Sequence, residues 1–223
     1  MSPLIIALGG LKRSGKDTFA GILAAVAKSR PNITPHRIAF AEPLRRAAAA
    51  AYDVPVAEFS DDSLKDVTHP AWGITRRQML INVGDAMRGV DADHWTKLLT
   101  RRIDPTQAVA GQFSRCRPLY IVTDLRRPNE AKALLDLGAT LVLVVRDGVV
   151  WDGHETEAMA GMAVTAWLGG RASGLKPKAY PYHLVVENTF PVNGDASMIP
   201  AATAAFEKAA NQLIDAVLST ARG

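Results

Sequence analysis

The start of the chain carries the pattern that most constrains its fold: a short apolar run leads directly into a glycine-rich turn. Residues 4–8 are Leu-Ile-Ile-Ala-Leu, and glycines follow at positions 9 and 10. A run of this length before glycines is typical of a strand buried on both faces. From Lys16 to Ser29 the apolar residues recur at spacings of three and four, which predicts a helix with one buried stripe. The chain therefore opens as strand, loop and helix.

The loop at residues 10–18 has the spacing G-x-x-x-x-G-K of the phosphate-binding P-loop. Its glycines let backbone N–H groups turn inward around a phosphate, Lys16 adds a positive charge, and the helix N-terminus adds its dipole. A tight strand-to-helix connection is the alternative interpretation of the glycines alone. Asp17 stands where Ser or Thr is usual and Thr18 follows, so either side chain could face Mg²⁺ or a phosphate. The candidate nucleotide-binding residues are Gly10, Lys12, Arg13, Ser14, Gly15, Lys16, Asp17 and Thr18.

Strand-like and helix-like segments alternate along the rest of the chain, which predicts a parallel sheet with helices on both faces. Thr75 and Asp91 stand where helix N-caps are expected. Residues 169–181, rich in Gly, Pro and Lys, are expected to form a loop. The expected strands are 4–8, 36–40, 119–123, 140–145 and 184–186. The expected helices are 16–29, 42–52, 75–87, 91–102, 128–137, 154–168 and 200–218.

Composition places the chain among ordinary globular proteins. It has 223 residues, 48% hydrophobic and 22% charged, which excludes collagen-like, disordered and disulfide-scaffold classes and favours a single domain. The one cysteine, Cys116, cannot form an internal disulfide. No apolar stretch approaches the roughly 18 residues of a membrane span, and the N-terminus lacks a signal-peptide pattern. We therefore expect a cytoplasmic protein with no membrane partner.

The net charge of +4 is small for a nucleic-acid-binding protein, so we expect no nucleic-acid partner. Arginines instead occur in pairs at several places, which fits clusters that hold a small anion. A solvated helix face is the alternative explanation of each pair taken alone. The pairs are 45–46, 76–77, 101–102 and 126–127.

A second motif follows the strand expected at 119–123. Asp124 comes at its end, and the carboxyl ends of parallel strands meet at the sheet edge where ligands gather. Asp124 can therefore hold a water on Mg²⁺, and Arg126 can reach either a transferring phosphoryl group or the phosphate of the acceptor. The alternative role of Asp124 is to cap the following helix. The candidate catalytic residues are Lys16, Asp124 and Arg126, and the candidate metal ligands are Asp17, Thr18 and Asp124.

Segments in order along most of the chain resemble the deoxynucleoside monophosphate kinases of tailed bacteriophages, a P-loop nucleoside monophosphate kinase family. The most specific matches are Phe40-Ala-Glu-Pro-Leu-Arg45 and Asp124-Leu-Arg-Arg-Pro-Asn-Glu-Ala131. This chain departs from the family pattern at Arg127, where an aromatic is usual, and at Thr156, where serine is usual. Further matches are the P-loop, Thr75-Arg-Arg-Gln-Met-Leu80, Gly84, Arg88, Asp93-His-Trp95 and His154-Glu-Thr-Glu157.

The resemblance implies a three-layer P-loop NTPase sandwich with a five-stranded parallel sheet. It further implies an acceptor-binding helical region at about 42–102 and a lid-like insertion at about 147–182. The implied reaction transfers the γ-phosphoryl group of ATP, with Mg²⁺, to a deoxynucleoside 5′-monophosphate. Family members are commonly dimers, and a phage-encoded enzyme would work in the host cytoplasm.

By analogy with kinases of this layout, the acceptor phosphate is held by Arg45, Arg76 and Arg88. Trp72 and Trp95 would line the acceptor pocket, with core packing as the alternative for both. A basic residue of the lid would close on the phosphates, and a plain basic loop is the alternative there. The lid candidates are Arg146, Arg171, Lys176 and Lys178.

Two other functions stay open at this point. A P-loop kinase could act on another small acceptor, such as dephospho-coenzyme A or phosphomevalonate, and a panel of acceptors separates these substrates. A nucleotide-dependent switch or DNA-packaging motor is the second alternative. The modest charge and small size count against it, and DNA-stimulated ATP hydrolysis would favour it.

Overall fold

The structure, a computed structural model, describes residues 2–103, 116–153, 155–173, 181–191 and 196–220. It divides into two compact units. The first, which we call the sheet unit, comprises Met1–Ile38 and Ile103–Gly223. The second, the helical unit, comprises Ala39–Arg102.

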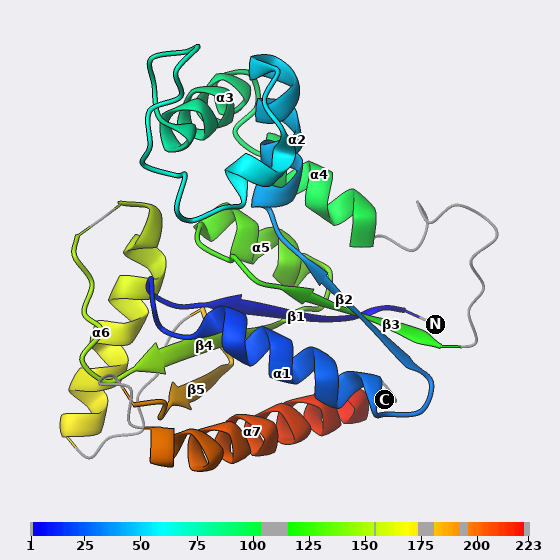
Figure 1. The fold of residues 1–223 in the computed structure, drawn as a ribbon. Helices are drawn as coiled ribbons and strands as arrows, with labels where there is room; N and C mark the ends of the chain where they lie inside the picture. The colour runs from blue at the N-terminus through cyan, green and yellow to red at the C-terminus, as the bar shows by residue number, and fades with distance from the viewer. Residues whose placement is uncertain (1, 104–115, 154, 174–180, 192–195, 221–223) are drawn as a thin grey trace. The chain divides into compact units, whose positions relative to one another are not determined.

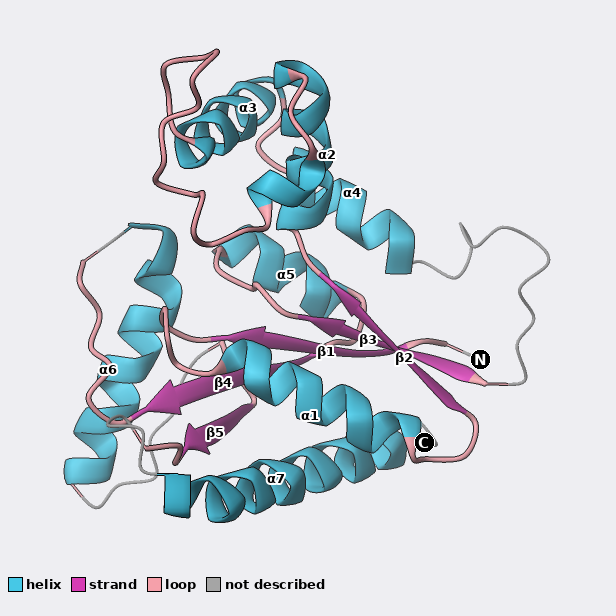
Figure 2. Ribbon diagram, viewed as in Figure 1, coloured by secondary structure: helices cyan, strands magenta, loops and turns pink. Residues whose placement is uncertain are grey.

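The sheet unit is built on a five-stranded parallel sheet with the strand order β2-β3-β1-β4-β5 (Figures 1 and 2). β1 is buried along its whole length because it lies at the centre, between β3 and β4. Parallel strands that are buried on both faces carry continuous apolar runs, as residues 4–8 do. The strands are β1 Leu4–Gly9, β2 Ile33–Ile38, β3 Arg117–Val122, β4 Thr140–Arg146 and β5 Leu184–Asn188.

Helices cover both faces of this sheet, which confirms the predicted α/β class (Figure 1). α1 (Lys16–Lys28) and α7 (Ile199–Thr220) pack together over one face, where Phe19 and Phe206 meet edge to face with ring centroids 5.0 Å apart. α5 (Pro128–Asp136) and α6 (Ala158–Ala172) both contact β4 and cover the other face. Short 3₁₀ turns precede α6 and α7, at Glu155–Glu157 (η2) and Ala196–Met198 (η3).

The helical unit has a small core of its own. It contains α2 (Ala41–Tyr52), η1 (Val56–Phe59), α3 (Arg76–Val90) and α4 (His94–Ile103). Thr75 caps α3 as predicted, since its hydroxyl accepts the backbone N–H of Gln78 at 3.1 Å. The buried core residues are Ala48, Ala49, Val54, Phe59 and Met79.

Several predicted boundaries were wrong, and the physical reason is clear for three of them. β2 begins at residue 33 rather than 36, because it is an edge strand that tolerates Pro35 and exposed polar residues. α4 begins at His94, since Asp91 instead forms a turn in which its carboxylate accepts the N–H of Asp93. α6 runs to Ala172, through two glycines expected to begin a loop, because its buried apolar side stabilises the helix.

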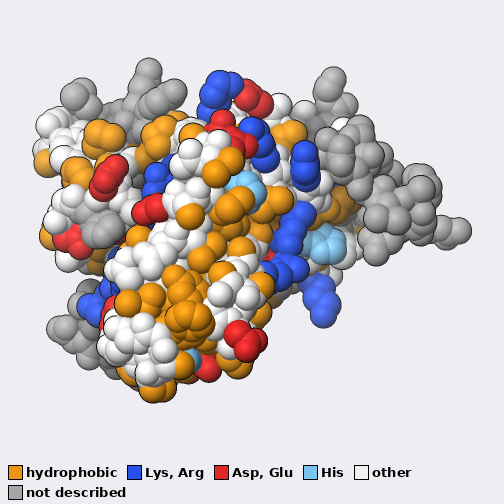
Figure 3. All heavy atoms as spheres, turned by 90° about the horizontal axis from the view of Figure 1, so that it is seen from above, with side chains coloured by type: hydrophobic (Ala, Val, Ile, Leu, Met, Phe, Trp, Pro, Cys, Tyr) orange, Lys and Arg blue, Asp and Glu red, His pale blue; other side chains and the backbone are white. Residues whose placement is uncertain are grey.

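The surface of the described residues is mixed in character. On the face drawn in Figure 3, basic side chains lie in several groups separated by apolar and acidic ones. No helix in the described part of the chain combines the length and apolar character needed to cross a membrane.

Candidate functional site

The P-loop segment, residues 10–18, joins the buried end of β1 to α1, and its glycines are required by their surroundings. Gly10 has φ +143°, and a Cβ there would lie 2.3 Å from the carbonyl oxygen of Val144. Gly15 has φ +93°, and its Cβ would lie 2.2 Å from the amide nitrogen of Asn188. Both positions therefore exclude any larger residue. The backbone passes close to β4 and β5 before it enters the first turn of α1.

Lys16 folds its side chain back over this loop. Its Nζ donates to the carbonyl oxygens of Gly10 and Leu11, both at 2.7 Å. Burial, together with the nearby positive charge of Arg126, lowers the pKa of Lys16 to about 8. Glu157, Asp17 and Asp124 oppose this shift. The ammonium thus lies at the centre of a group of charged side chains, where an additional anion would favour its protonated form.

The structure brings the Asp124–Arg126 segment to this same edge of the sheet. The N–H of Leu125 donates to the carbonyl of Leu8 at 3.2 Å, which ties the segment to the end of β1. Both Asp124 and Arg126 lie close enough to Lys16 to affect its pKa. Lys16, Asp124 and Arg126 therefore lie in the same part of the sheet unit, and their catalytic roles stay a prediction.

Glu130 holds this segment in place from the first turn of α5. One of its carboxylate oxygens accepts the backbone N–H groups of Arg126 at 2.9 Å and Arg127 at 3.0 Å. Glu130 is only 7% exposed, and burial raises its pKa to about 7 although both hydrogen bonds favour the ionised form. The buried carboxyl group of Glu130 therefore orients the backbone that carries Arg126.

Asn188, at the end of β5, links the P-loop to a neighbouring pocket. Its amide nitrogen donates to the carbonyl of Ser14 at 2.8 Å, and the side chain is buried. The same residue lines a pocket of about 280 Å³ at the carboxyl ends of β4 and β5. Within this pocket Arg146 donates to the carbonyls of Phe190 and Pro191, while its Nε has no partner among the described residues. Asn188 thus contacts both the P-loop segment and this pocket, whose lining also includes Asp147 and Glu187.

The remaining polar side chains of the P-loop segment lie at the surface, except one. Lys12 and Arg13 are exposed, and Arg13 has φ +64°. Asp17 and Thr18 are exposed on the first turn of α1, and Asp17 lies 3.7 Å from Arg37. Ser14 is buried, and its hydroxyl has no partner among the described residues. A buried hydroxyl without a partner is uncommon in folded proteins.

The described residues contain no group of three or more His, Cys, Asp or Glu side chains arranged to hold a metal ion. Asp17 and Asp124 each lie close enough to Lys16 to raise its pKa. Mg²⁺ is usually bound by one or two carboxylates together with substrate phosphates, rather than by an all-protein cage. The carboxylates present therefore fit a Mg²⁺ ion that arrives with a nucleotide.

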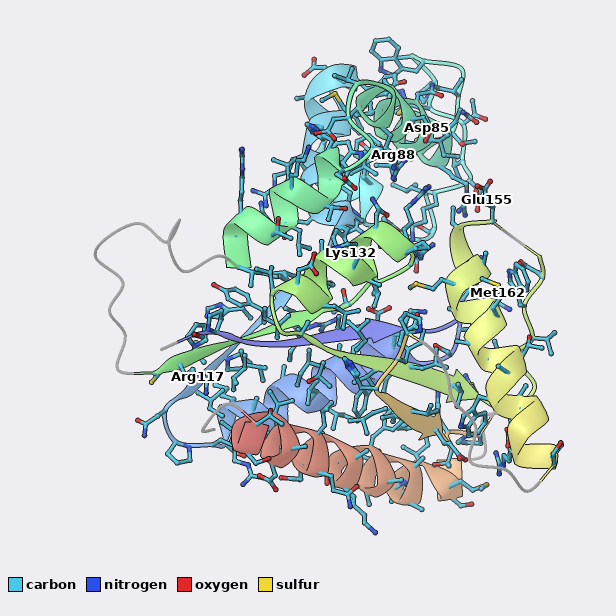
Figure 4. The ribbon with its side chains drawn as sticks, turned by 180° about the vertical axis from the view of Figure 1, so that it is seen from behind. Asp85, Arg88, Arg117, Lys132, Glu155 and Met162 are labelled. Atoms are coloured by element: carbon cyan, nitrogen blue, oxygen red, sulfur yellow. The ribbon has the colours of Figure 1, made fainter. Side chains whose placement is uncertain are left out.

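The acceptor candidates Arg45 and Arg88 belong to the helical unit. Arg45 is half-buried on α2. Arg88 on α3 pairs with Asp85 at 2.9 Å, one turn away, and Figure 4 labels both side chains. Gly84 allows α2 and Arg88 to approach, since its Cβ would lie 3.1 Å from Arg88 Nη1 and 3.7 Å from Leu44.

The other acceptor candidates have partners inside the helical unit. Arg76 is 7% exposed, binds Glu58 through Nε at 3.1 Å and Nη2 at 2.5 Å, and donates to the carbonyl of Val67. Trp95 is buried and donates to the carbonyl of Gly84. Both side chains therefore have structural contacts in this structure.

Trp72 differs from these two residues because it is 46% exposed. Its ring packs edge to face on Tyr52, with centroids 5.1 Å apart. One side of the Trp72 ring thus stays accessible to a ligand.

Two of the lid candidates can be placed. Arg146 lies at the end of β4 and is engaged with the carbonyls described above. Arg171 lies over the Trp167 ring, 5.3 Å from its centroid, and 3.4 Å from Glu187. Lys176, Lys178 and His154 lie outside the described residues.

Three site residues had no role assigned from sequence: Glu130, Asn188 and Glu157, whose carboxylate accepts the N–H of Lys12 at 3.1 Å. Glu130 had a local signal, because an acidic residue in the first turn of a helix after Pro128 is the pattern of a capping box. Glu157 belongs to a segment that resembles the kinase family, but neither it nor Asn188 had a signal for its partner, since the partners lie 145 and 174 residues away.

Comparison with known proteins found neither a matching family model nor a matching curated protein. Among solved structures, the chain is similar to a gluconokinase from Sinorhizobium meliloti 1021, with 12% identity over 95% of this chain and 96% of that one, and a TM-score of 0.36. It is also similar to a protein described as a kinase from Chloroflexus aurantiacus J-10-fl, with 12% identity over 89% and 95% of the chains and a TM-score of 0.35. At these TM-scores neither likeness carries an argument about function.

Proposed function

We propose that this chain is an ATP-dependent kinase that phosphorylates a deoxynucleoside 5′-monophosphate. The observation that supports this most is the charged group at the carboxyl edge of the sheet, where Lys16, Asp124 and Arg126 gather beside the P-loop segment. Phosphoryl transfer needs positioning and charge neutralisation more than covalent chemistry, and these residues provide both.

In this proposal the P-loop amides and Lys16 bind the β- and γ-phosphates of the donor. The nucleoside of the donor extends into the pocket beside Asn188, because Asn188 joins the loop to that pocket. Buried Ser14 supplies a hydroxyl with no partner among the described residues, which can reach a phosphate oxygen. The donor is therefore fixed along the edge from β1 to β5.

Two basic side chains neutralise negative charge at the phosphoryl group that is transferred. An oxygen of the acceptor phosphate attacks the γ-phosphorus, the bond to the β–γ bridging oxygen breaks, and ADP leaves. Arg126 stabilises the charge on the equatorial oxygens, while Lys16 stabilises the leaving phosphate. Asp124, with Asp17 or Thr18, would hold Mg²⁺, which supplies further charge neutralisation.

The acceptor belongs to the helical unit in this proposal. Arg45 and Arg88 are assigned to its phosphate, and the exposed side of Trp72 to its base. Arg76 is better assigned to the stability of this unit, given its bonds to Glu58. The homodimer implied by the resemblance stays a prediction, which light scattering would test.

A coupled assay for ADP with a panel of deoxy- and ribonucleoside monophosphates tests the proposal. We expect ADP release that depends on at least one deoxynucleoside monophosphate and is lost in Lys16→Ala. Lys28→Ala, at the exposed last turn of the same helix, is the matched control and should keep full activity. ADP release stimulated only by dephospho-coenzyme A or phosphomevalonate would replace the acceptor. No stimulation by any of these compounds would refute the proposal.

A further inference from the structure

One acidic side chain reaches the P-loop from a distant part of the chain. Glu157 closes η2 and is the N-cap residue of α6, and its carboxylate accepts the backbone N–H of Lys12 at 3.1 Å. Its side chain makes no capping hydrogen bond to its own helix. Glu is not among the residues that usually cap a helix, which are Ser, Thr, Asp and Asn. Glu157 instead binds the loop.

The atom that Glu157 binds is a backbone donor of the loop that we propose holds a phosphate. A P-loop holds phosphate oxygens through inward-facing backbone N–H groups, and the Lys12 N–H belongs to this loop. The Glu157 carboxylate is also close enough to Lys16 to raise the pKa of its ammonium group, against the effect of burial. Glu157 therefore provides the loop with a negative charge and an acceptor oxygen, the two properties of a bound phosphate.

We propose that Glu157 is an internal competitor for the donor phosphates. An N–H group has one hydrogen to donate, so the Lys12 amide binds either Glu157 or a phosphate oxygen. This inference rests on the proposed nucleotide site. It implies that nucleotide binding there has a free-energy cost, because the contact with Glu157 must first be broken. Donor binding breaks the hydrogen bond between Glu157 and the Lys12 N–H. The contact of η2 and the start of α6 with the P-loop therefore depends on whether a nucleotide is bound there.

The chain offers variants that separate contact from charge. Glu157→Gln removes the charge and leaves a weaker acceptor. Glu157→Asp keeps the charge but shortens the side chain by one methylene, which withdraws the carboxylate from the Lys12 amide. Glu155→Gln is the matched control, because Glu155 is an exposed carboxylate on the same turn, at the N-terminal end of α6 in Figure 4.

Isothermal titration calorimetry with MgATP alone, on the full chain, tests the inference. Loss of one charge-assisted hydrogen bond that competes with the ligand should lower the Kd roughly three- to tenfold in Glu157→Gln. Glu157→Asp should also lower the Kd for MgATP, whereas Glu155→Gln should leave this Kd within about twofold of wild type.

The other results are equally informative. A higher Kd in Glu157→Gln would overturn the inference, because Glu157 would then help to hold the nucleotide. Tighter binding in Glu157→Gln but not in Glu157→Asp would also overturn it, since general charge alone would explain the effect. Normal MgATP binding by wild type with unchanged variants refutes this inference and leaves the proposed function intact. Failure of wild type and all variants to bind MgATP refutes both.

Discussion

Glu130→Gln should change how the stability of this protein depends on pH. Burial raises the pKa of Glu130 from 4.5 to about 7 in the folded chain. Between these values the native state holds a proton that the unfolded state has lost. The free energy of unfolding of the wild type therefore falls as pH rises through this window. Gln has the same shape and can still accept the N–H groups of Arg126 and Arg127, but it does not ionise.

The magnitude follows from the width of the window. Each pH unit contributes about 1.4 kcal/mol, so the stability of Glu130→Gln relative to wild type should increase by about 3 kcal/mol between pH 4.5 and pH 8. Glu130 is almost fully buried, so solvent screens this effect little. The same substitution in the exposed Glu207 of α7 is a matched control, and its profile should run parallel to that of wild type.

Urea denaturation followed by far-UV circular dichroism, at several pH values between about 4.5 and 8, measures this difference. Parallel profiles of wild type and Glu130→Gln, within about 1 kcal/mol, would refute the reasoning, because they would mean that Glu130 ionises alike in both states. A relative destabilisation of the variant at high pH would refute it too. That result would mean that the two backbone hydrogen bonds outweigh the cost of burying the charge.

Three further predictions concern the P-loop and the helical unit. Lys16→Ala should abolish phosphoryl transfer and leave the circular dichroism spectrum unchanged. Wild-type activity should fall above about pH 8 as Lys16 loses its proton, and a rate that stays unchanged up to about pH 9 would contradict this. Gly15→Ala should destabilise the chain by more than about 1 kcal/mol in urea and weaken MgATP binding, because its Cβ meets Asn188 at a positive φ; wild-type stability would show that the loop rearranges freely. Arg76→Ala should destabilise the protein by about 3 kcal/mol, because it leaves buried polar partners behind, whereas Arg88→Ala should mainly raise the KM of the acceptor. Equal losses of stability in Arg76→Ala and Arg88→Ala would contradict this division of roles.

Local features of the chain were readable from the sequence because they depend on neighbouring residues. The apolar run at 4–8, the glycines of the P-loop and the cap at Thr75 each report on a few consecutive dihedral angles or on one turn of helix. The position of Asp124 followed equally, since the ends of parallel strands meet at one edge whatever the order of the strands. The sequence thus determined the sheet, its flanking helices and the edge at which the candidate site lies.

The tertiary structure alone decided which polar groups meet across the fold. Asn188 binds the Ser14 carbonyl only because β5 lies beside β4, and Glu157 binds the Lys12 amide only because η2 returns to the loop. Arg76 likewise meets Glu58 through the folding of the helical unit, although its sequence context equally suited a phosphate ligand. Hydrophobic periodicity specifies which face of an element is buried. It does not specify which distant hydrogen-bonding group that face meets, because this depends on strand order and loop path.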